Sequence, residues 1–202
     1  MKVLIVYYSM YGNVYKMAQL VAEGVKAVPG TEPVVRKVPE LIPEAVVAGR
    51  EDMKAGRDLQ KNVPLVTVND FREAGAIAFG TPTRFGNVAA QLKNQIDQLT
   101  SLWMEGALIG KPAGVFVSTA TQHGGQETTA LTLMAPLLHL GFVLVGVPYS
   151  VQELFTTQGG GSPYGPGHIA GGDGQREIDP QEAAICRAFG RRLAETGLKL
   201  QK

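Results

Sequence analysis

The sequence predicts an α/β fold with a doubly wound, five-stranded parallel sheet between two layers of helices. Short apolar runs without polar alternation are typical of strands buried on both faces. Segments with apolar residues at helical spacing separate these runs, and such alternation favours right-handed βαβ units. The chain has 202 residues, which is enough for one such domain with a substantial core.

The elements follow in order along the chain. The first strand is expected in the apolar run from Lys2 to Tyr8, and the first helix from Asn13 to about Val28, before Pro29-Gly30. Four more strands are expected at 34–38, 76–80, 113–117 and 142–145. Three more helices are expected at 89–99, 126–140 and 180–200. At roughly 30 residues per strand–helix unit, these elements account for about 150 residues.

Two stretches make up the remaining length, and we expect both to be long loop insertions. Residues 39–64 contain prolines at 39, 43 and 64 together with mixed charges. Residues 147–178 include Gly159–Gly174, in which eight of sixteen residues are glycine. Loops this long within a compact domain are usually functional or disordered. Because the glycine segment also carries Tyr164 and His168, we expect an ordered loop supported by neighbouring subunits. Residues 1–202 are expected to form a single domain.

Composition excludes several classes of protein. The net charge is +1 and no basic stripe is present, which argues against a nucleic-acid partner. Cys186 is the one cysteine, so neither a disulfide framework nor a multi-cysteine metal site is expected. The sequence contains no run of about 20 apolar residues, so no membrane-spanning helix is expected. The apolar run after Lys2 is too short for a signal peptide, so we expect a cytoplasmic protein.

Candidate ligand-binding residues follow the first strand, since ligands of open α/β sheets bind beyond the carboxyl ends of strands. This first loop comprises Ser9, Met10, Tyr11, Gly12, Asn13 and Val14. It leads into a helix N-terminus, whose free N–H groups and dipole suit a phosphate. The absence of a Walker pattern argues against nucleotide triphosphate hydrolysis. The alternative is an ordinary turn in which Ser9 or Asn13 caps the helix.

Two more loops follow the third and fourth strands. The second, Gly80–Asn87, combines the hydroxyl of Thr83, the cation of Arg84 and the ring of Phe85. This mixture suits a planar polar heterocycle, although Arg84 could instead pair with a carboxylate elsewhere. The third loop offers small hydroxyl residues followed by glycines, which can wrap a ligand edge. Its candidate residues are Ser118, Thr119, Ala120, Thr121, Gln122 and His123.

Three segments carry a family resemblance. Tyr7–Asn13, Phe79–Asn87 and Ala170–Gly174 closely resemble the WrbA family of flavodoxin-like NAD(P)H:quinone oxidoreductases. The resemblance extends from Lys2 to the last helix. It implies a flavodoxin-like fold, non-covalently bound FMN, NADH or NADPH as electron donor, a quinone substrate and a homotetramer. Catalysis would be flavin-centred, without a covalent catalytic residue.

The same resemblance assigns roles to individual residues. The Ser9–Val14 loop would hold the FMN phosphate, and Tyr11 would also meet the nicotinamide. Thr83, Arg84 and Phe85, together with residues 118–123, would hold the isoalloxazine ring. His139 would reach the flavin site and Trp103 would line the substrate site. From the residues alone, His139 reads as a helix-end histidine near the C-terminal dipole, and Trp103 as a half-buried packing residue.

One departure from the family concerns the third loop, where Gln122-His123 stands between Thr121 and Gly124, whereas the family loop is shorter and richer in glycine. Two alternative functions also remain open. A one-electron flavodoxin-type carrier is usually strongly acidic, unlike this chain. A regulatory flavin-binding module is the other alternative.

Overall fold

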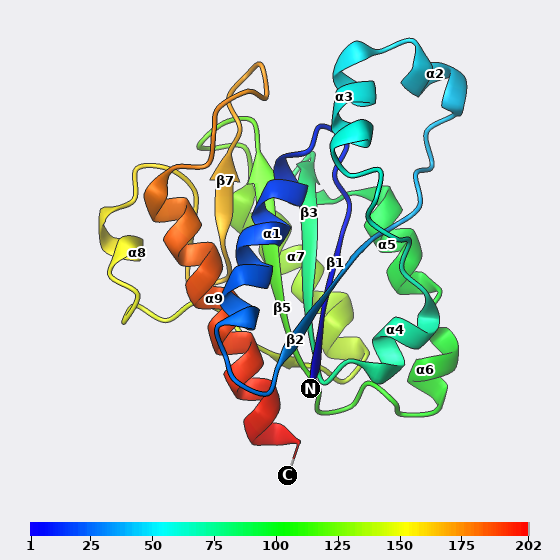
Figure 1. The fold of residues 1–202 in the computed structure, drawn as a ribbon, viewed down its shortest axis with the longest axis vertical. Helices are drawn as coiled ribbons and strands as arrows, with labels where there is room; N and C mark the ends of the chain where they lie inside the picture. The colour runs from blue at the N-terminus through cyan, green and yellow to red at the C-terminus, as the bar shows by residue number, and fades with distance from the viewer. Residues whose placement is uncertain (202) are drawn as a thin grey trace.

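The computed structural model describes residues 1–201 and contains a mainly parallel, seven-stranded sheet (Figure 1). Its central path has the order β2-β1-β3-β5-β6, the flavodoxin-like doubly wound order. These strands are β1 (Lys2–Tyr7), β2 (Glu32–Lys37), β3 (Ala76–Arg84), β5 (Pro112–Thr119) and β6 (Val143–Leu144). The predicted fold class is therefore confirmed. Two short strands, β4 (Asn87–Val88) and β7 (Gly167–Ile169), were not foreseen.

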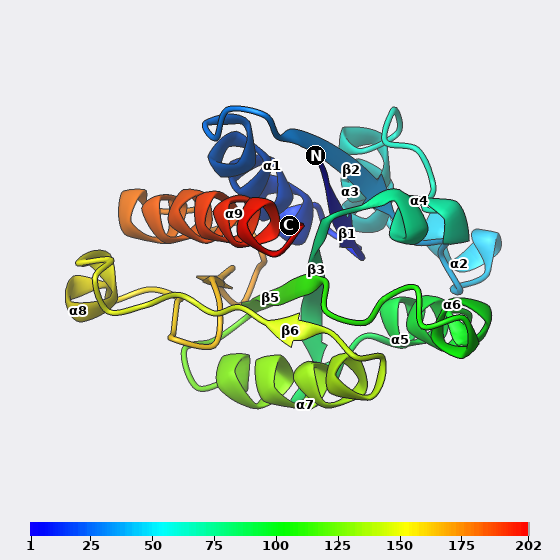
Figure 2. The same cartoon turned by 90° about the horizontal axis from the view of Figure 1, so that it is seen from below.

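Helices cover both faces of the sheet (Figure 2). On one face lie α1 (Asn13–Lys26) and α9 (Pro180–Leu200), and on the other α5 (Ala90–Asp97) and α7 (Gln126–His139). Alternate residues of β1 point into the two cores: Val3 and Ile5 belong to the cluster under α1 and α9, and Leu4 to the other. This explains why the run shows no polar alternation.

Close packing of α1 against α9 depends on two glycines. A Cβ on Gly24 would lie 2.0 Å from the Arg187 carbonyl oxygen, and one on Gly190 would lie 2.1 Å from that of Val21. Any side chain at either position would push the helices apart. This crossing holds the second half of α1 against α9, and the first turn of α1 borders the cavity described below.

The first insertion is helical, so the prediction of a long loop was wrong there. It contains α2 (Glu44–Ala48) and α3 (Glu51–Leu59), and α3 stands above the carboxyl ends of the strands (Figure 1). Three further short helices are α4 (Val68–Glu73), α6 (Thr100–Met104) and α8 (Glu153–Thr156). Only Met53 and Gly56 of α3 are buried, which leaves too narrow an apolar stripe to reveal the helix in the sequence.

The second insertion interrupts the edge strand beside β5. β6 pairs with the start of β5, where Pro112 lies opposite Val143, and β7 pairs with its end, where Val117 lies opposite Gly167. The insertion also returns to its own chain, because the N–H groups of Gly160 and Ile169 both donate to Glu182 of α9. These contacts within the chain anchor the insertion to α9, and the expected support from neighbouring subunits stays a prediction.

Within residues 1–201, none of the helices combines the length and the apolar character that crossing a membrane requires.

Candidate functional site

A cavity of about 650 Å³ lies beyond the carboxyl ends of β1, β3 and β5. Its volume is within the range of small-molecule sites. The three predicted loops meet here, with α3 and the segment Ala170–Gln175 as additional walls. The predicted residues that line the cavity are Ser9, Met10, Tyr11, Asn13, Val14, Thr83, Arg84, Ser118, Thr119 and Ala120.

The first loop presents a row of unused backbone donors. Within residues 1–201, the N–H groups from Met10 to Val14 donate to no acceptor. Gly12 occupies the N-cap position of α1 with φ of 92°, and no side chain caps the helix. The Ser9 hydroxyl does accept the Tyr15 N–H, over 3.2 Å, so Ser9 satisfies one donor of the first turn. The other donors are arranged as an anion-binding helix terminus requires.

The second loop is a tight hairpin between β3 and β4. Arg84 lies opposite Asn87, and the two turn residues Phe85 and Gly86 have φ of 53° and 77°. Positive φ at both positions defines a type I′ turn. An aromatic residue is strained in this conformation. The Phe85 side chain is also fully exposed, so it does not line the cavity of its own chain.

Two polar side chains of this loop are fixed in different ways. The Thr83 hydroxyl oxygen accepts the Gly86 N–H over 3.1 Å and the Thr129 hydroxyl over 2.8 Å. Arg84 donates to the Thr83 carbonyl over 3.0 Å, and its guanidinium lies 3.7 Å from the sulfur of Met10. No carboxylate in the described part of the chain pairs with Arg84. Its half-buried cation therefore faces the cavity beside the unused donors of the first loop.

The third loop divides into a lining half and an exposed half. Ser118 and Thr119 are buried, and with Ala120 they border the cavity. The Thr119 hydroxyl donates to the carbonyl of Thr121 over 2.8 Å, which turns the chain outward. The exposed residues Thr121, Gln122 and His123 do not line the cavity. The Gln122-His123 departure thus lies at the outer tip of the loop.

The α3 wall was not predicted from the sequence. A Cβ on Gly56 would lie 2.3 Å from the Met10 carbonyl oxygen, so the α3 backbone rests directly on the first loop. The side-chain amide of Gln60, which is 5% exposed, donates to the Ser9 carbonyl over 2.6 Å. These contacts brace the row of donors from the side of α3.

A buried ionic cluster holds the other additional wall. The Glu182 side chain is fully buried and lies 2.9 Å from Nδ1 of His168. It accepts the backbone N–H groups of Gly160, Ile169 and Asp179 and the guanidinium of Arg176. Burial alone would raise the pKa of Glu182, but hydrogen bonds from His168 and the N–H groups of Gly160 and Ile169 lower it to about 2. The charged carboxylate thereby ties the start of Ala170–Gln175 to α9.

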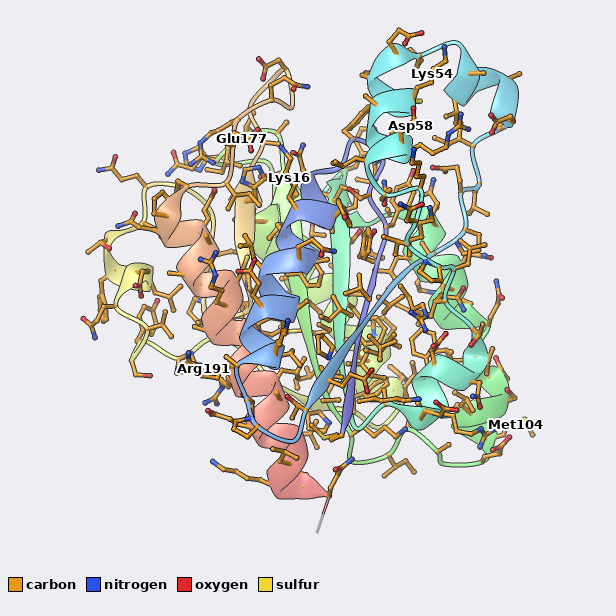
Figure 3. All side chains as sticks on the ribbon, in the orientation of Figure 1. Lys16, Lys54, Asp58, Met104, Glu177 and Arg191 are labelled. Carbon is orange, nitrogen blue, oxygen red and sulfur yellow. The ribbon has the colours of Figure 1, made fainter. Side chains whose placement is uncertain are left out.

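Two predicted site residues lie far from this cavity. Trp103 is 55% exposed in α6, next to Met104, which Figure 3 labels at the far end of the molecule. His139 ends α7, which begins near the cavity, and a helix of this length spans roughly 20 Å. Neither side chain can contact a ligand in the cavity of its own chain. Their assigned roles therefore stay predictions that require a neighbouring copy.

Comparisons with known proteins agree with this geometry. The profile of the family described as NADPH-dependent FMN reductase matches residues 1–155. A relative named NAD(P)H dehydrogenase (quinone) from Trichlorobacter lovleyi is 49% identical over 98% of both chains. Another of that name, from Geobacter sulfurreducens, is 48% identical over 99% of both.

Solved structures share the fold at lower identity. A flavodoxin described as WrbA-like, from Agrobacterium tumefaciens, superposes with a TM-score of 0.68 at 21% identity, over 98% of both chains. An archaeal flavodoxin gives a TM-score of 0.63 at 17% identity, over 98% of this chain and 99% of that one. The family resemblance seen in the sequence is thereby confirmed, and the chain belongs to the NADPH-dependent FMN reductase family.

Proposed function

We propose that this protein is an NAD(P)H:quinone oxidoreductase that binds FMN in the cavity at the carboxyl ends of β1, β3 and β5. The observation that carries the proposal is the row of N–H donors from Met10 to Val14 that no acceptor within residues 1–201 uses, beside the guanidinium of Arg84, which pairs with no carboxylate in that range. An anionic group with a planar polar ring fits this combination. Overall, NAD(P)H, a proton and a quinone are converted to NAD(P)⁺ and a hydroquinone.

Residues of the cavity fit the parts of FMN separately. The Met10–Val14 donors and the α1 dipole would hold the phosphate. Thr83, Arg84 and the loop Ser118–Ala120 would border the isoalloxazine ring, and Ala170–Gln175 would close the third side. Bound FMN would supply two-electron chemistry between a nicotinamide donor and a quinone.

The chain itself supplies binding, orientation and charge. Arg84 would stabilise negative charge near the ring, because its cation has no competing carboxylate in the described residues. Tyr11, 42% exposed at the cavity, offers an aromatic face to a flat substrate. Cys186 takes no part, since it is fully buried in α9. If donor and quinone use the same space in turn, initial-rate plots will give parallel lines.

A homotetramer would complete the site. Trp103 and Phe85 are large aromatic side chains exposed to solvent on this chain, and His139 is also exposed. Exposed aromatic groups of this size are typical of association surfaces. In the proposed assembly, Trp103, Phe85 and His139 reach the cavity of a neighbouring copy. A fully active monomer in sedimentation would contradict this assembly.

One titration tests the central proposal. FMN is added to the purified protein, and binding is followed by the quenching of flavin fluorescence. NADH or NADPH is then added without oxygen, followed by benzoquinone. We expect the flavin absorbance to bleach with the donor and to recover with one equivalent of quinone. Failure to take up FMN would contradict the proposal. Reduction in two separate one-electron steps without turnover would instead favour the carrier alternative.

A further inference from the structure

We propose that Arg50, the N-cap residue of α3, and Asp52, in its first turn, determine how the enzyme discriminates between NADH and NADPH. In this proposal, Arg50 binds a phosphate of the donor at the mouth of the cavity. Asp52 forms an ion pair with Arg50 and so lowers the affinity for NADPH, the donor that carries an additional 2′-phosphate. The inference rests on the proposed function, and its test below is separable from that of FMN-dependent turnover.

The position of the pair is the first argument. Arg50 and Asp52 both line the cavity, on the side of α3 that faces Tyr11. A Cβ on Gly56, in the same helix, would lie 2.7 Å from the Cα of Tyr11, so the α3 backbone packs directly on the loop that carries Tyr11. In the proposed site, a donor whose nicotinamide meets Tyr11 would have its phosphates on this side of the cavity, where Arg50 and Asp52 lie.

The charge distribution around the cavity is the second argument. Among residues 1–201, three cations line it, namely Lys16, Arg50 and Arg84. Arg84 lies against the sulfur of Met10, where it would serve the proposed FMN site, and Lys16 is held by Glu177 over 3.0 Å, a pair visible in Figure 3. Arg50 is the cation that the α3 side of the cavity offers to a second anionic ligand, once its pair with Asp52 opens.

The geometry of the pair explains how it can discriminate. The Arg50 Nε lies 3.0 Å from one oxygen of Asp52, and Nη2 lies 2.5 Å from the other. Such a two-point pair uses the face of the guanidinium that would otherwise bind a phosphate. Both side chains remain about half exposed, so the pair can open when a ligand arrives. Arginine can accommodate the 2′-phosphate of NADP, whereas a carboxylate suits the 2′-hydroxyl of NAD.

The experiment compares Asp52→Asn with Glu51→Gln. Both changes remove one negative charge from the first turn of α3, but Glu51 pairs with Lys54 and does not line the cavity. Loss of Asp52 frees Arg50 for the 2′-phosphate. We therefore expect Asp52→Asn to raise the ratio of kcat/KM for NADPH to that for NADH by about tenfold, the size of one charge-assisted hydrogen bond. The change should appear in KM rather than kcat, and Glu51→Gln should leave the ratio within about twofold.

Arg50→Gln supplies the complementary arm. It should weaken the use of both donors, and in the double variant with Asp52→Asn the gain for NADPH should disappear. Calorimetric titration of the FMN-loaded proteins with NAD⁺ and NADP⁺ gives a second measurement that needs no turnover. We expect tighter NADP⁺ binding in Asp52→Asn and weaker binding of both in Arg50→Gln.

The outcomes separate the two proposals. If Asp52→Asn and Glu51→Gln shift the donor ratio equally, or if Arg50→Gln binds both nucleotides as the unchanged protein does, the specificity role is wrong. If the unchanged protein takes up FMN but oxidises neither donor, the proposed function fails instead. The nucleotide titrations then decide the role of the pair independently.

Discussion

Replacement of Glu182 by glutamine tests whether one buried charge holds a wall of the cavity. Glu182 accepts Gly160 and Ile169 through one oxygen, and it lies within 2.9 Å of Nδ1 of His168 through the other. A glutamine keeps the size of the side chain but replaces one accepting oxygen with an NH₂ group. This NH₂ group cannot accept the hydrogen bonds that the carboxylate oxygen accepted. At least one buried hydrogen bond is lost, and the charge that Arg176 compensates disappears.

The magnitude follows from the pKa. The carboxyl of Glu182 titrates at about 2 rather than at its ordinary value of 4.5. Each unit is worth 1.36 kcal/mol, so the charged carboxylate contributes about 3 kcal/mol to the free energy of unfolding at neutral pH. Because the folded-state pKa is lowered, this contribution is present above pH 4.5 and is lost as the pH falls towards 2. The variant has no such contribution at any pH.

Urea unfolding followed by circular dichroism measures the effect in the FMN-free protein. At pH 7 we expect Glu182→Gln to be less stable by about 3 kcal/mol, and this difference should shrink as the pH is lowered from 4.5. Glu195→Gln is the matched control, since Glu195 lies exposed on the same helix, and it should behave as the unchanged protein. A difference that is as large at pH 3 as at pH 7 would refute the assignment of the effect to this charge.

Three further changes test other parts of the structure. Gly56→Ala places a Cβ 2.3 Å from the Met10 carbonyl oxygen and should weaken FMN binding about tenfold, because the contact is overpacked. In the control Gly49→Ala, the new Cβ meets no described atom nearer than 3.5 Å, so FMN binding should stay unchanged. Equal FMN affinities of the two variants would contradict the role of Gly56. Phe85→Gly removes strain at φ of 53° and should raise the free energy of unfolding by about 1 kcal/mol; a less stable variant would show that the ring is needed for folding. Burial raises the pKa of Cys186, so a thiol reagent should react only in urea, and rapid labelling of the folded protein would contradict this burial.

The sheet was predictable because its strands are buried on both faces. Val3 and Ile5 face one helical layer and Leu4 the other. A run that is apolar at every position therefore indicates a sheet covered by helices on both faces. The hairpin at Phe85-Gly86 was not predictable, because its type I′ turn lacks the usual Asn-Gly or Asp-Gly pair. β7 was missed because it has three residues, one of which is the buried histidine His168, hydrogen-bonded to Glu182.

The site was predictable to the extent that strand topology brings it together. Parallel strands end at one edge, so loops that follow β1, β3 and β5 had to meet there. The contact of α3 with this edge was hidden, because Gly56 packs on Met10 through backbone atoms across 46 residues of sequence. Arg50 and Asp52 then read as ordinary surface charges. The distance of Trp103 from the cavity was equally hidden, since its assigned role came from a family resemblance and not from the topology of one chain.

Because the edge strand is interrupted, ligand binding in the cavity is coupled to the tendency of the protein to aggregate. β7 is the short strand that covers the end of β5, from Val117 to Thr119, and the chain continues from it directly into the cavity wall at Ala170–Gln175. Detachment of this segment would open the cavity and expose an unpaired sheet edge in the same event. Unpaired edges template association between molecules. A ligand that binds against Ala170–Gln175 would therefore also hold β7 on β5 and disfavour edge-to-edge aggregation.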